Sequence, residues 1–347
     1  MNRRKFGSQL AMMWGGGTLA ARGRTESSMS GRIRAASDYS AANRGKSLLV
    51  LQHGGVIYEN YPNGFVVNEA HKIYSGTKGF WCLAALAAEE DGVLRLKDQA
   101  ADTIHEWQDD RQKSRITIRQ LLDFTSGLDP YFELHEDGIS DRDRLAIHRH
   151  LAAEPGSAFI YGPCSLQVFH EILKRKLSHS GESTTHYLER RVLRPMGLGP
   201  QRYVADHSGN PLLAAGFQLS ARQWVQIGKT VLNESEHVAP PEAIASCINQ
   251  GSRVNGSFGL GFWNNSNARR MGAWEVDVEA MLHEKWPVQR WRNACLSRSA
   301  PSDLVAAIGS GCQRLYVVPS QDLVVVRQGK DSAFSDAHFL RLLFGGA

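Results

Sequence analysis

Hydrophobic residues follow two patterns along the chain, one at its two ends and another in its middle. Near the start, residues 47–61 place two apolar runs around His53-Gly54-Gly55, which predicts a β-hairpin. Near the end, strands are expected over 256–263, 314–319 and 323–327. Apolar spacing of three and four residues predicts helices over 75–88, 116–124, 166–177, 187–193, 221–232 and 335–344.

Strands therefore open and close the globular part of the chain, and helices fill its middle. The economical arrangement is an α+β fold with one antiparallel sheet, built from N- and C-terminal segments, flanked by helices and carrying an inserted helical lobe. We assign residues 35–100 and 245–347 to the sheet lobe and residues 101–244 to the mainly helical lobe.

The net charge of +5 suggests a nucleic-acid partner until its distribution is considered. Residues 1–34 carry seven basic residues and one acidic residue, a balance of +6, and the other 33 basic and 34 acidic residues leave −1. The globular part is close to neutral, so we expect no nucleic-acid partner. Its 42% hydrophobic content is typical of a protein that buries a large core.

The basic leader, residues 1–34, has the features of an export signal. It begins with Asn2-Arg3-Arg4-Lys5-Phe6, which resembles a bacterial twin-arginine start, and continues with a glycine-rich stretch from Leu10 to Ala21. That stretch is too short to span a bilayer, and no other segment is long and apolar enough, so no transmembrane segment is expected in the mature chain. We expect a disordered leader and a periplasmic or secreted location. The alternative is a basic tail on a cytoplasmic protein.

The tetrapeptide Ser75-Gly76-Thr77-Lys78 is the only Ser-x-x-Lys in the chain. A lysine three residues after a serine faces that serine across one helical turn. The start of the predicted helix supplies partial positive charge and free N–H groups, and an apolar helix lowers the pKa of the lysine so that its neutral amine accepts a proton. These groups suit acyl transfer through a serine nucleophile. The alternative is an N-capping serine followed by a solvated lysine.

The order of several motifs resembles the class C β-lactamase-like serine hydrolases, the β-lactamase, D,D-peptidase and esterase relatives built on the penicillin-binding fold. The resemblance covers about residues 45–345, in which the hydrolase domain of residues 35–347 is expected. The matching stretches are Tyr74–Lys78, Glu90–Asp98, Ile116–Leu128 (Ile-Thr-Ile-Arg-Gln-Leu-Leu-Asp-Phe-Thr-Ser-Gly-Leu), Glu154–Tyr161 and Leu193–Leu198.

This resemblance implies roles for particular residues. Ser75 would attack a carbonyl carbon, and Lys78 and Tyr161 would share the proton, the tyrosine acting as base or shuttle if the lysine's charge lowers its pKa. The oxyanion would lie between the backbone N–H of Ser75 and an N–H of the family's third motif. That motif falls on Gly309, Ser310, Gly311, Cys312 and Gln313, with the donor expected near Gln313.

The chain departs from the family pattern at two positions. The family's Tyr-x-Asn reads Tyr161-Gly162-Pro163, which removes the side-chain amide that holds the substrate's acyl amide and contacts the lysine. Ser310 stands in place of a lysine or histidine that helps to bind a carboxylate. We therefore expect a small-molecule ester or small amide as substrate, with weak β-lactamase activity at most. The rivals are a catalytically inactive binding protein on the same fold and a helical interaction protein without a site.

No cofactor or metal is expected, because the chain has no His-Glu-x-x-His, Walker or dinucleotide motif and no Cys-x-x-Cys. A single disulfide remains open, since the sequence does not identify partners among Cys82, Cys164, Cys247, Cys295 and Cys312. The stretch from Trp274 to Cys295 fits no motif of the family and is either an insertion near the site or a surface excursion. Two roles are open for a group of aromatic residues, which either pack in the core or line a pocket for the acyl group: Trp224, Phe262, Trp263, Trp274, Trp286 and Trp291.

Overall fold

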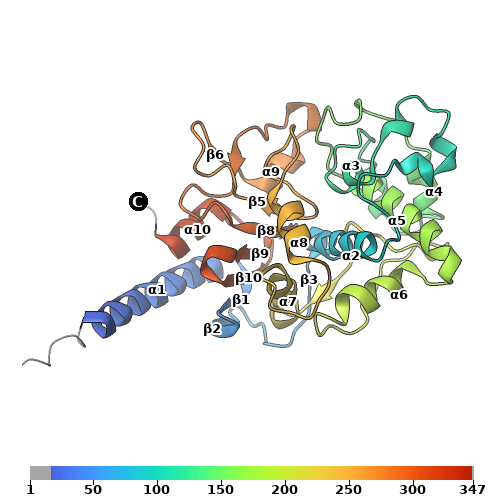
Figure 1. Ribbon diagram of the computed structural model, residues 1–347. Coiled ribbons are helices and arrows are strands. Elements are labelled where there is room, and N and C mark those ends of the chain that lie inside the picture. Colours follow the sequence, from blue (N-terminus) through green and yellow to red (C-terminus); the bar gives the residue numbers. More distant parts are fainter. Residues whose placement is uncertain (1–16, 346–347) are drawn as a thin grey trace, which may run out of the picture.

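A six-stranded sheet built from both ends of the chain forms the centre of the computed structural model, which describes residues 17–345 (Figure 1). Every pairing within this sheet is antiparallel. In spatial order its strands are β2 (Gly55–Asn60), β1 (Gly45–Gln52), β10 (Leu323–Gly329), β9 (Gln313–Val318), β8 (Val305–Gly309) and β5 (Trp263–Asn264). The α+β prediction and the assembly of one sheet from N- and C-terminal segments are confirmed.

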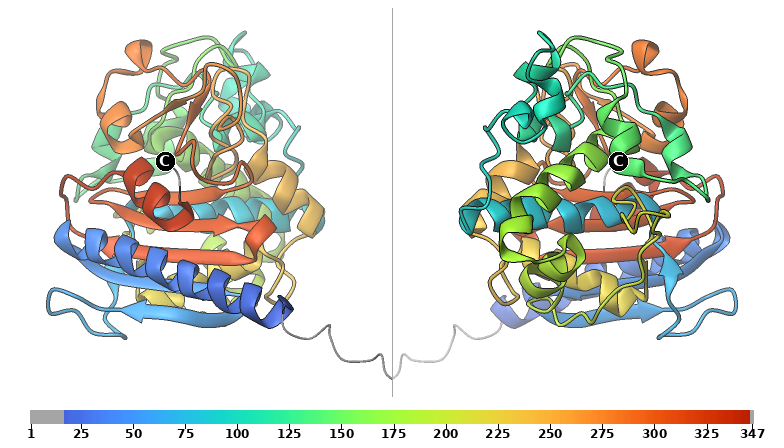
Figure 2. Two further views of the ribbon diagram at one scale, coloured as in Figure 1. Left: turned by 90° about the vertical axis from the view of Figure 1, so that its left-hand side faces the viewer. Right: turned by 90° about the vertical axis from the view of Figure 1, so that its right-hand side faces the viewer.

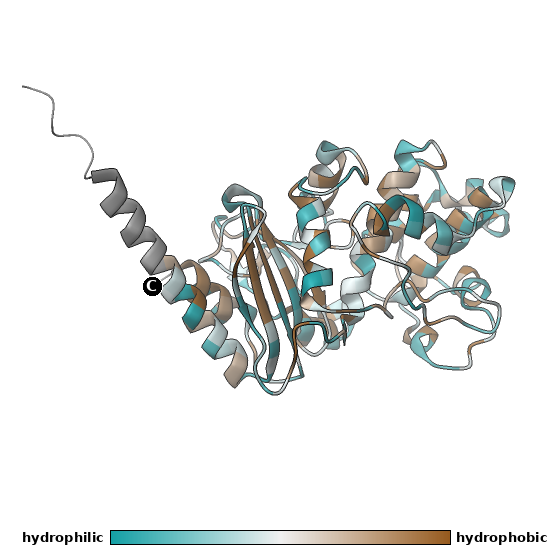
Figure 3. Cartoon of the chain, turned by 90° about the horizontal axis from the view of Figure 1, so that it is seen from below, coloured by the Kyte–Doolittle hydropathy of each residue, from teal (hydrophilic) through white to brown (hydrophobic). Residues whose placement is uncertain are grey.

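The central strands β1, β9 and β10 are buried on both faces, which explains their nearly continuous apolar runs. Val50 lies opposite Val325, and Val326 lies opposite Leu315. The strands are accordingly the most hydrophobic part of the cartoon in Figure 3. Two-stranded sheets pair β3 (His71–Lys72) with β4 (Gln218–Leu219) and β6 (Trp274–Glu275) with β7 (Ala294–Cys295).

Helices cover both faces of this sheet (Figure 2). Helices α1 and α10 pack together on one face, and α7 packs on the other against β1, β9 and β10. Most of the helical middle of the chain lies to one side of the sheet (Figure 1). The helices are α1 (Gly17–Ala42), α2 (Lys78–Glu90), α3 (Ile118–Leu122), α4 (Arg142–Ile147), α5 (Pro163–Leu177), α6 (Thr184–Leu188), α7 (Ala221–Val231), α8 (Pro241–Asn249), α9 (Val278–His283) and α10 (Asp336–Phe344).

Most predicted elements correspond to observed ones, but the strand expected over 256–263 is wrong. Only Trp263 and Asn264 form a strand there, and β8 was not predicted. Gly261 has φ +73°, and a Cβ on it would lie 2.8 Å from the Cys82 sulfur. The chain therefore turns at this glycine, against α2, rather than continuing as an extended strand.

The expectation of a disordered leader over residues 1–34 is wrong from residue 17 onward, because α1 begins at Gly17. The stretch lacks proline, and Ile33 and Ala36 are buried where α1 packs against α10. The twin-arginine start, residues 2–6, lies outside the described residues. No helix within the described residues combines the length and the apolar character that a membrane span requires.

Candidate functional site

Ser75 lies where the chain turns sharply from β3 into α2. Tyr74, just before it, has φ +46°, and residues Tyr74–Thr77 form a single 3₁₀ turn that runs directly into α2. A left-handed conformation is costly for a tyrosine, so the surrounding packing must hold it. Gly76 permits this packing, because a Cβ there would lie 2.7 Å from the Trp224 ring. The nucleophile candidate therefore sits at the start of a helix.

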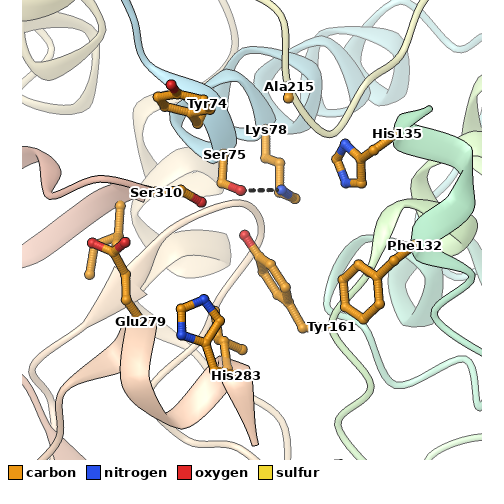
Figure 4. A pocket seen from close by; sticks show the side chains of 13 residues that line it. Tyr74, Ser75, Lys78, Phe132, His135, Tyr161, Ala215, Glu279, His283 and Ser310 are labelled. Carbon is orange, nitrogen blue, oxygen red and sulfur yellow. Dashed lines mark hydrogen bonds between the residues drawn. The ribbon is translucent and has the colours of Figure 1, made fainter. Parts of the chain in front are cut away.

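Lys78 is buried directly beside Ser75. Its side chain is 2% exposed, and its Nζ lies 2.8 Å from Ser75 Oγ and 2.9 Å from the Ala214 carbonyl oxygen (Figure 4). Burial lowers the pKa of Lys78 to about 7, because an ammonium in this site has lost its water. Near neutral pH much of the lysine is therefore a neutral amine able to accept a proton. The alternative of a solvated lysine is wrong.

Tyr161 completes a cluster with Ser75 and Lys78. Its hydroxyl points toward the other two side chains, and Lys78 Nζ lies 4.7 Å from its ring centroid (Figure 4). Burial raises the pKa of Tyr161 well above 10, and a hydrogen bond with Ser75 only partly offsets this effect. A Tyr161 pKa lowered by the lysine's charge was the condition for its acting as a base, and desolvation shifts this pKa in the opposite direction. Tyr161 is therefore suited to relay a proton as a neutral phenol rather than to act as a phenolate base.

The third motif forms the tight turn between β8 and β9, next to the nucleophile. A Cβ on Gly309 would lie 2.0 Å from the Ile73 carbonyl oxygen, so this position requires glycine. Of the candidate residues in the turn, Ser310 lines the pocket that contains Ser75 and Lys78.

The other three candidates of the third motif are already engaged. The N–H groups of Gly311 and Cys312 donate to the Glu279 carboxylate, at 2.9 and 3.0 Å. Gln313 is fully buried, and its side-chain amide donates to backbone carbonyls. In the same turn, the Ser310 N–H has no hydrogen-bond partner within residues 17–345.

The pocket encloses about 490 Å³ around the three candidate catalytic side chains. Its aromatic lining comes from Tyr74, Phe132 and Tyr161, and the six aromatic residues considered from the sequence lie elsewhere. The stretch from Trp274 to Cys295 lies near the site, because its helix α9 contributes three lining residues (Figure 4). The pocket residues that sequence reasoning missed are Phe132, His135, Gly162, Ala215, Glu279, Leu282, His283 and Ile308.

Pro163 has a structural role at the position where the family has asparagine. It is the first residue of α5, where its missing N–H costs no helical hydrogen bond. Gly162, before it, packs so closely that a Cβ would lie 2.6 Å from Pro130. The second partner of Lys78 is instead the Ala214 carbonyl, from a loop far along the sequence.

All five cysteines are buried free thiols in the structure. Burial raises the pKa of the thiols of Cys82, Cys164, Cys247 and Cys295, which makes them poor nucleophiles near neutral pH. No group of three or more histidine, cysteine or carboxylate side chains within the described residues is arranged to hold a metal ion.

Comparisons with solved structures agree with this fold. EstCE1, described as a hydrolase with promiscuous acyltransferase activity, superposes with a TM-score of 0.68 at 19% identity, covering 92% of this chain and 100% of its own. A class C beta-lactamase from Rhodobacter sphaeroides gives 0.62 at 18% identity, covering 90% of this chain and 96% of its own. A family VIII carboxylesterase gives 0.63 at 15% identity, with the same two coverages. These likenesses show the fold.

A search among curated proteins found no match. The sequence pattern of the Beta-lactamase family, however, matches residues 32–328. This match spans the sheet, the Ser75 turn, the helical middle of the chain and the third-motif turn. The chain therefore belongs to the Beta-lactamase family of serine hydrolases.

Proposed function

We propose that this protein is an exported serine hydrolase that cleaves an ester or a small amide through an acyl-enzyme on Ser75. The observation that carries the proposal is the contact of 2.8 Å between Ser75 Oγ and the buried amine of Lys78. A serine hydroxyl is a weak nucleophile unless a base removes its proton, and a lysine with a pKa of about 7 is such a base.

The reaction follows from these contacts. Neutral Lys78 takes the proton of the Ser75 hydroxyl as Oγ bonds to the carbonyl carbon, and the carbonyl oxygen becomes an oxyanion. In this proposal the backbone N–H groups of Ser75 and Ser310 donate to that oxyanion. The proton then passes through the Tyr161 hydroxyl to the leaving oxygen or nitrogen as its bond to carbon breaks. Water, activated by the same groups, releases the acid and frees Ser75.

Esters are favoured over β-lactams because the two groups that bind a carboxylated amide are replaced. Pro163 offers no side-chain amide, and Ser310 offers no cation. An ester also has a better leaving group than an amide and needs less assistance from the enzyme. A carboxylesterase and a class C beta-lactamase are similar to this chain to nearly the same degree, so the preference rests on these two positions. Export is proposed from the twin-arginine start at residues 2–6.

Covalent labelling tests this proposal directly. Native wild-type protein and Ser75→Ala are treated with a fluorescent fluorophosphonate and, separately, with a fluorescent penicillin, and hydrolysis of p-nitrophenyl acetate and butyrate is followed. We expect fluorophosphonate labelling and ester hydrolysis that disappear in Ser75→Ala, with little penicillin labelling. Heat-denatured wild-type protein controls for nonspecific labelling. If neither reagent labels the native protein, the rival of an inactive binding protein replaces the enzyme.

A further inference from the structure

The turn that joins β8 to β9, residues 310–312, is held by side chains from several parts of the chain. Its carbonyl groups accept from Gln313, whose Nε2 lies 2.7 Å from the Gly311 oxygen, and from Arg327, whose NH1 donates to the Cys312 oxygen. Residues 311 and 312 both have left-handed backbone, with φ +70° and +61°. This conformation is unfavourable for a cysteine, so the turn depends on its partners.

Glu279, on helix α9, binds the N–H groups of Gly311 and Cys312 in this turn. Its Oε2 accepts from Gly311 N–H at 2.9 Å, and its Oε1 accepts from Cys312 N–H at 3.0 Å. Successive N–H groups in left-handed backbone form a concave anion site, and the carboxylate occupies it with both oxygens. The Glu279 side chain is 21% exposed and lines the same pocket as Ser75 (Figure 4).

Arg314 fixes the position of this carboxylate. Its NH1 lies 2.7 Å from Glu279 Oε1, and the same nitrogen donates to the carbonyls of Gly309 and Gln313 at the two ends of the turn. The other side of the guanidinium makes a bidentate pair with Asp336, at 2.6 and 3.0 Å. Because Arg314 is 1% exposed and fully paired, it is a rigid support.

One N–H of the turn is left for the substrate. Within residues 17–345, the Ser310 N–H has no partner, while the next two N–H groups, of Gly311 and Cys312, donate to Glu279. We propose that Glu279 is a positioning residue that holds residues 310–312 so that the Ser310 N–H donates to the oxyanion. This inference rests on the proposed serine hydrolase function. Under this inference, the stretch from Trp274 to Cys295 helps to stabilise the transition state and does not serve packing alone.

The variants Glu279→Gln and Glu279→Ala test this role, with Glu284→Gln as a matched control. Glu284 is an exposed glutamate directly after α9. In Glu279→Gln one acceptor becomes an NH₂ group that faces an N–H donor, and in Glu279→Ala the anion site is empty. We expect kcat for p-nitrophenyl esters to fall about tenfold to a hundredfold, a part of the roughly 10²–10³-fold that a lost oxyanion donor costs. KM should change by less than about twofold, because the lost interaction is made in the transition state and not with the bound substrate. Glu284→Gln should match the wild type.

Rescue by a small carboxylate separates positioning from general stability. Formate fits the anion site vacated in Glu279→Ala, so we expect added formate to raise kcat of this variant severalfold while chloride at the same ionic strength does not. Formate should leave the wild type unchanged. Glu279→Gln, which keeps the side-chain volume, serves if Glu279→Ala folds poorly.

Two sets of results overturn the inference. The first is kcat within about twofold of wild type in both Glu279 variants. The second is a loss that appears in KM alone or that formate does not relieve. Failure of the proposed function looks different, because wild-type protein would then show no fluorophosphonate labelling at Ser75 and no esterase activity to compare.

Discussion

Replacing the buried amine of Lys78 by the thioether of methionine should change how stability depends on pH. In the folded protein burial lowers the pKa of Lys78 from 10.5 to about 7. On unfolding the amine returns to water and its pKa returns to the ordinary value. Between these two pKa values the unfolded chain binds more protons than the folded chain, so the free energy of unfolding rises with pH. Lys78→Met removes this contribution.

The size of the effect follows from the two pKa values. Each full pH unit between them changes the free energy of unfolding by about 1.4 kcal/mol. Near pH 7 the folded lysine is only half deprotonated, so the rise from about pH 6 to about pH 8.5 comes to roughly 2 kcal/mol. The contribution is smallest at acidic pH, where Lys78 must be charged in an apolar site, and it grows until the amine in the unfolded chain also loses its proton.

Urea unfolding followed by tryptophan fluorescence at several pH values measures this difference. The free energy of unfolding of the wild type should rise relative to that of Lys78→Met by about 2 kcal/mol over the stated range. Lys97→Met, at an exposed lysine, is the matched control and should follow the wild type. If the curves of wild type and Lys78→Met stay parallel to within about 0.5 kcal/mol, Lys78 keeps its proton in the folded state and cannot be the general base.

Two further predictions concern activity. The rate of ester hydrolysis by the wild type should fall below about pH 7, because protonation of Lys78 removes the base. A profile of kcat/KM against pH should therefore decline toward acidic pH with a midpoint near that value. A rate that stays level down to pH 5 would contradict the assignment of Lys78 as the base. Tyr161→Phe keeps the ring packed against Phe124 but removes the proton relay, so kcat should drop by about 10²–10⁴-fold while the unfolding midpoint in urea stays close to that of the wild type.

The contact between Ser75 and Lys78 was predictable because it is local. Residues three apart on a helical turn face each other, so the tetrapeptide fixes the geometry almost regardless of the rest of the fold. The sheet was predictable for a similar reason, since its central strands β9 and β10 are short apolar runs with a turn between them. In both cases the physical information lies within a few consecutive residues.

The partners that complete the site could not be predicted, because they come from far along the chain. The Ala214 carbonyl is a backbone group 136 residues from Lys78, and any residue type supplies one. Glu279 lies 32 residues before Gly311, in a stretch that matches no family motif. The only sequence signal for a special backbone at the third motif was the pair Gly309 and Gly311. That signal indicated a close approach but not the carboxylate that binds there.

The two departures from the family pattern have different consequences for holding the catalytic groups and for binding a substrate. The Ala214 carbonyl contacts Lys78 where Pro163 supplies no amide, and Glu279 secures the turn that carries Ser310. Both replacements keep the reacting groups in place. Neither provides the lost recognition, because a carbonyl oxygen cannot donate to a substrate amide and a carboxylate repels a substrate carboxylate. Under the proposed function, we expect a site altered in this way to retain acyl transfer and to discriminate against anionic amides, and we expect neutral esters to be the acyl donors that lose least from the change.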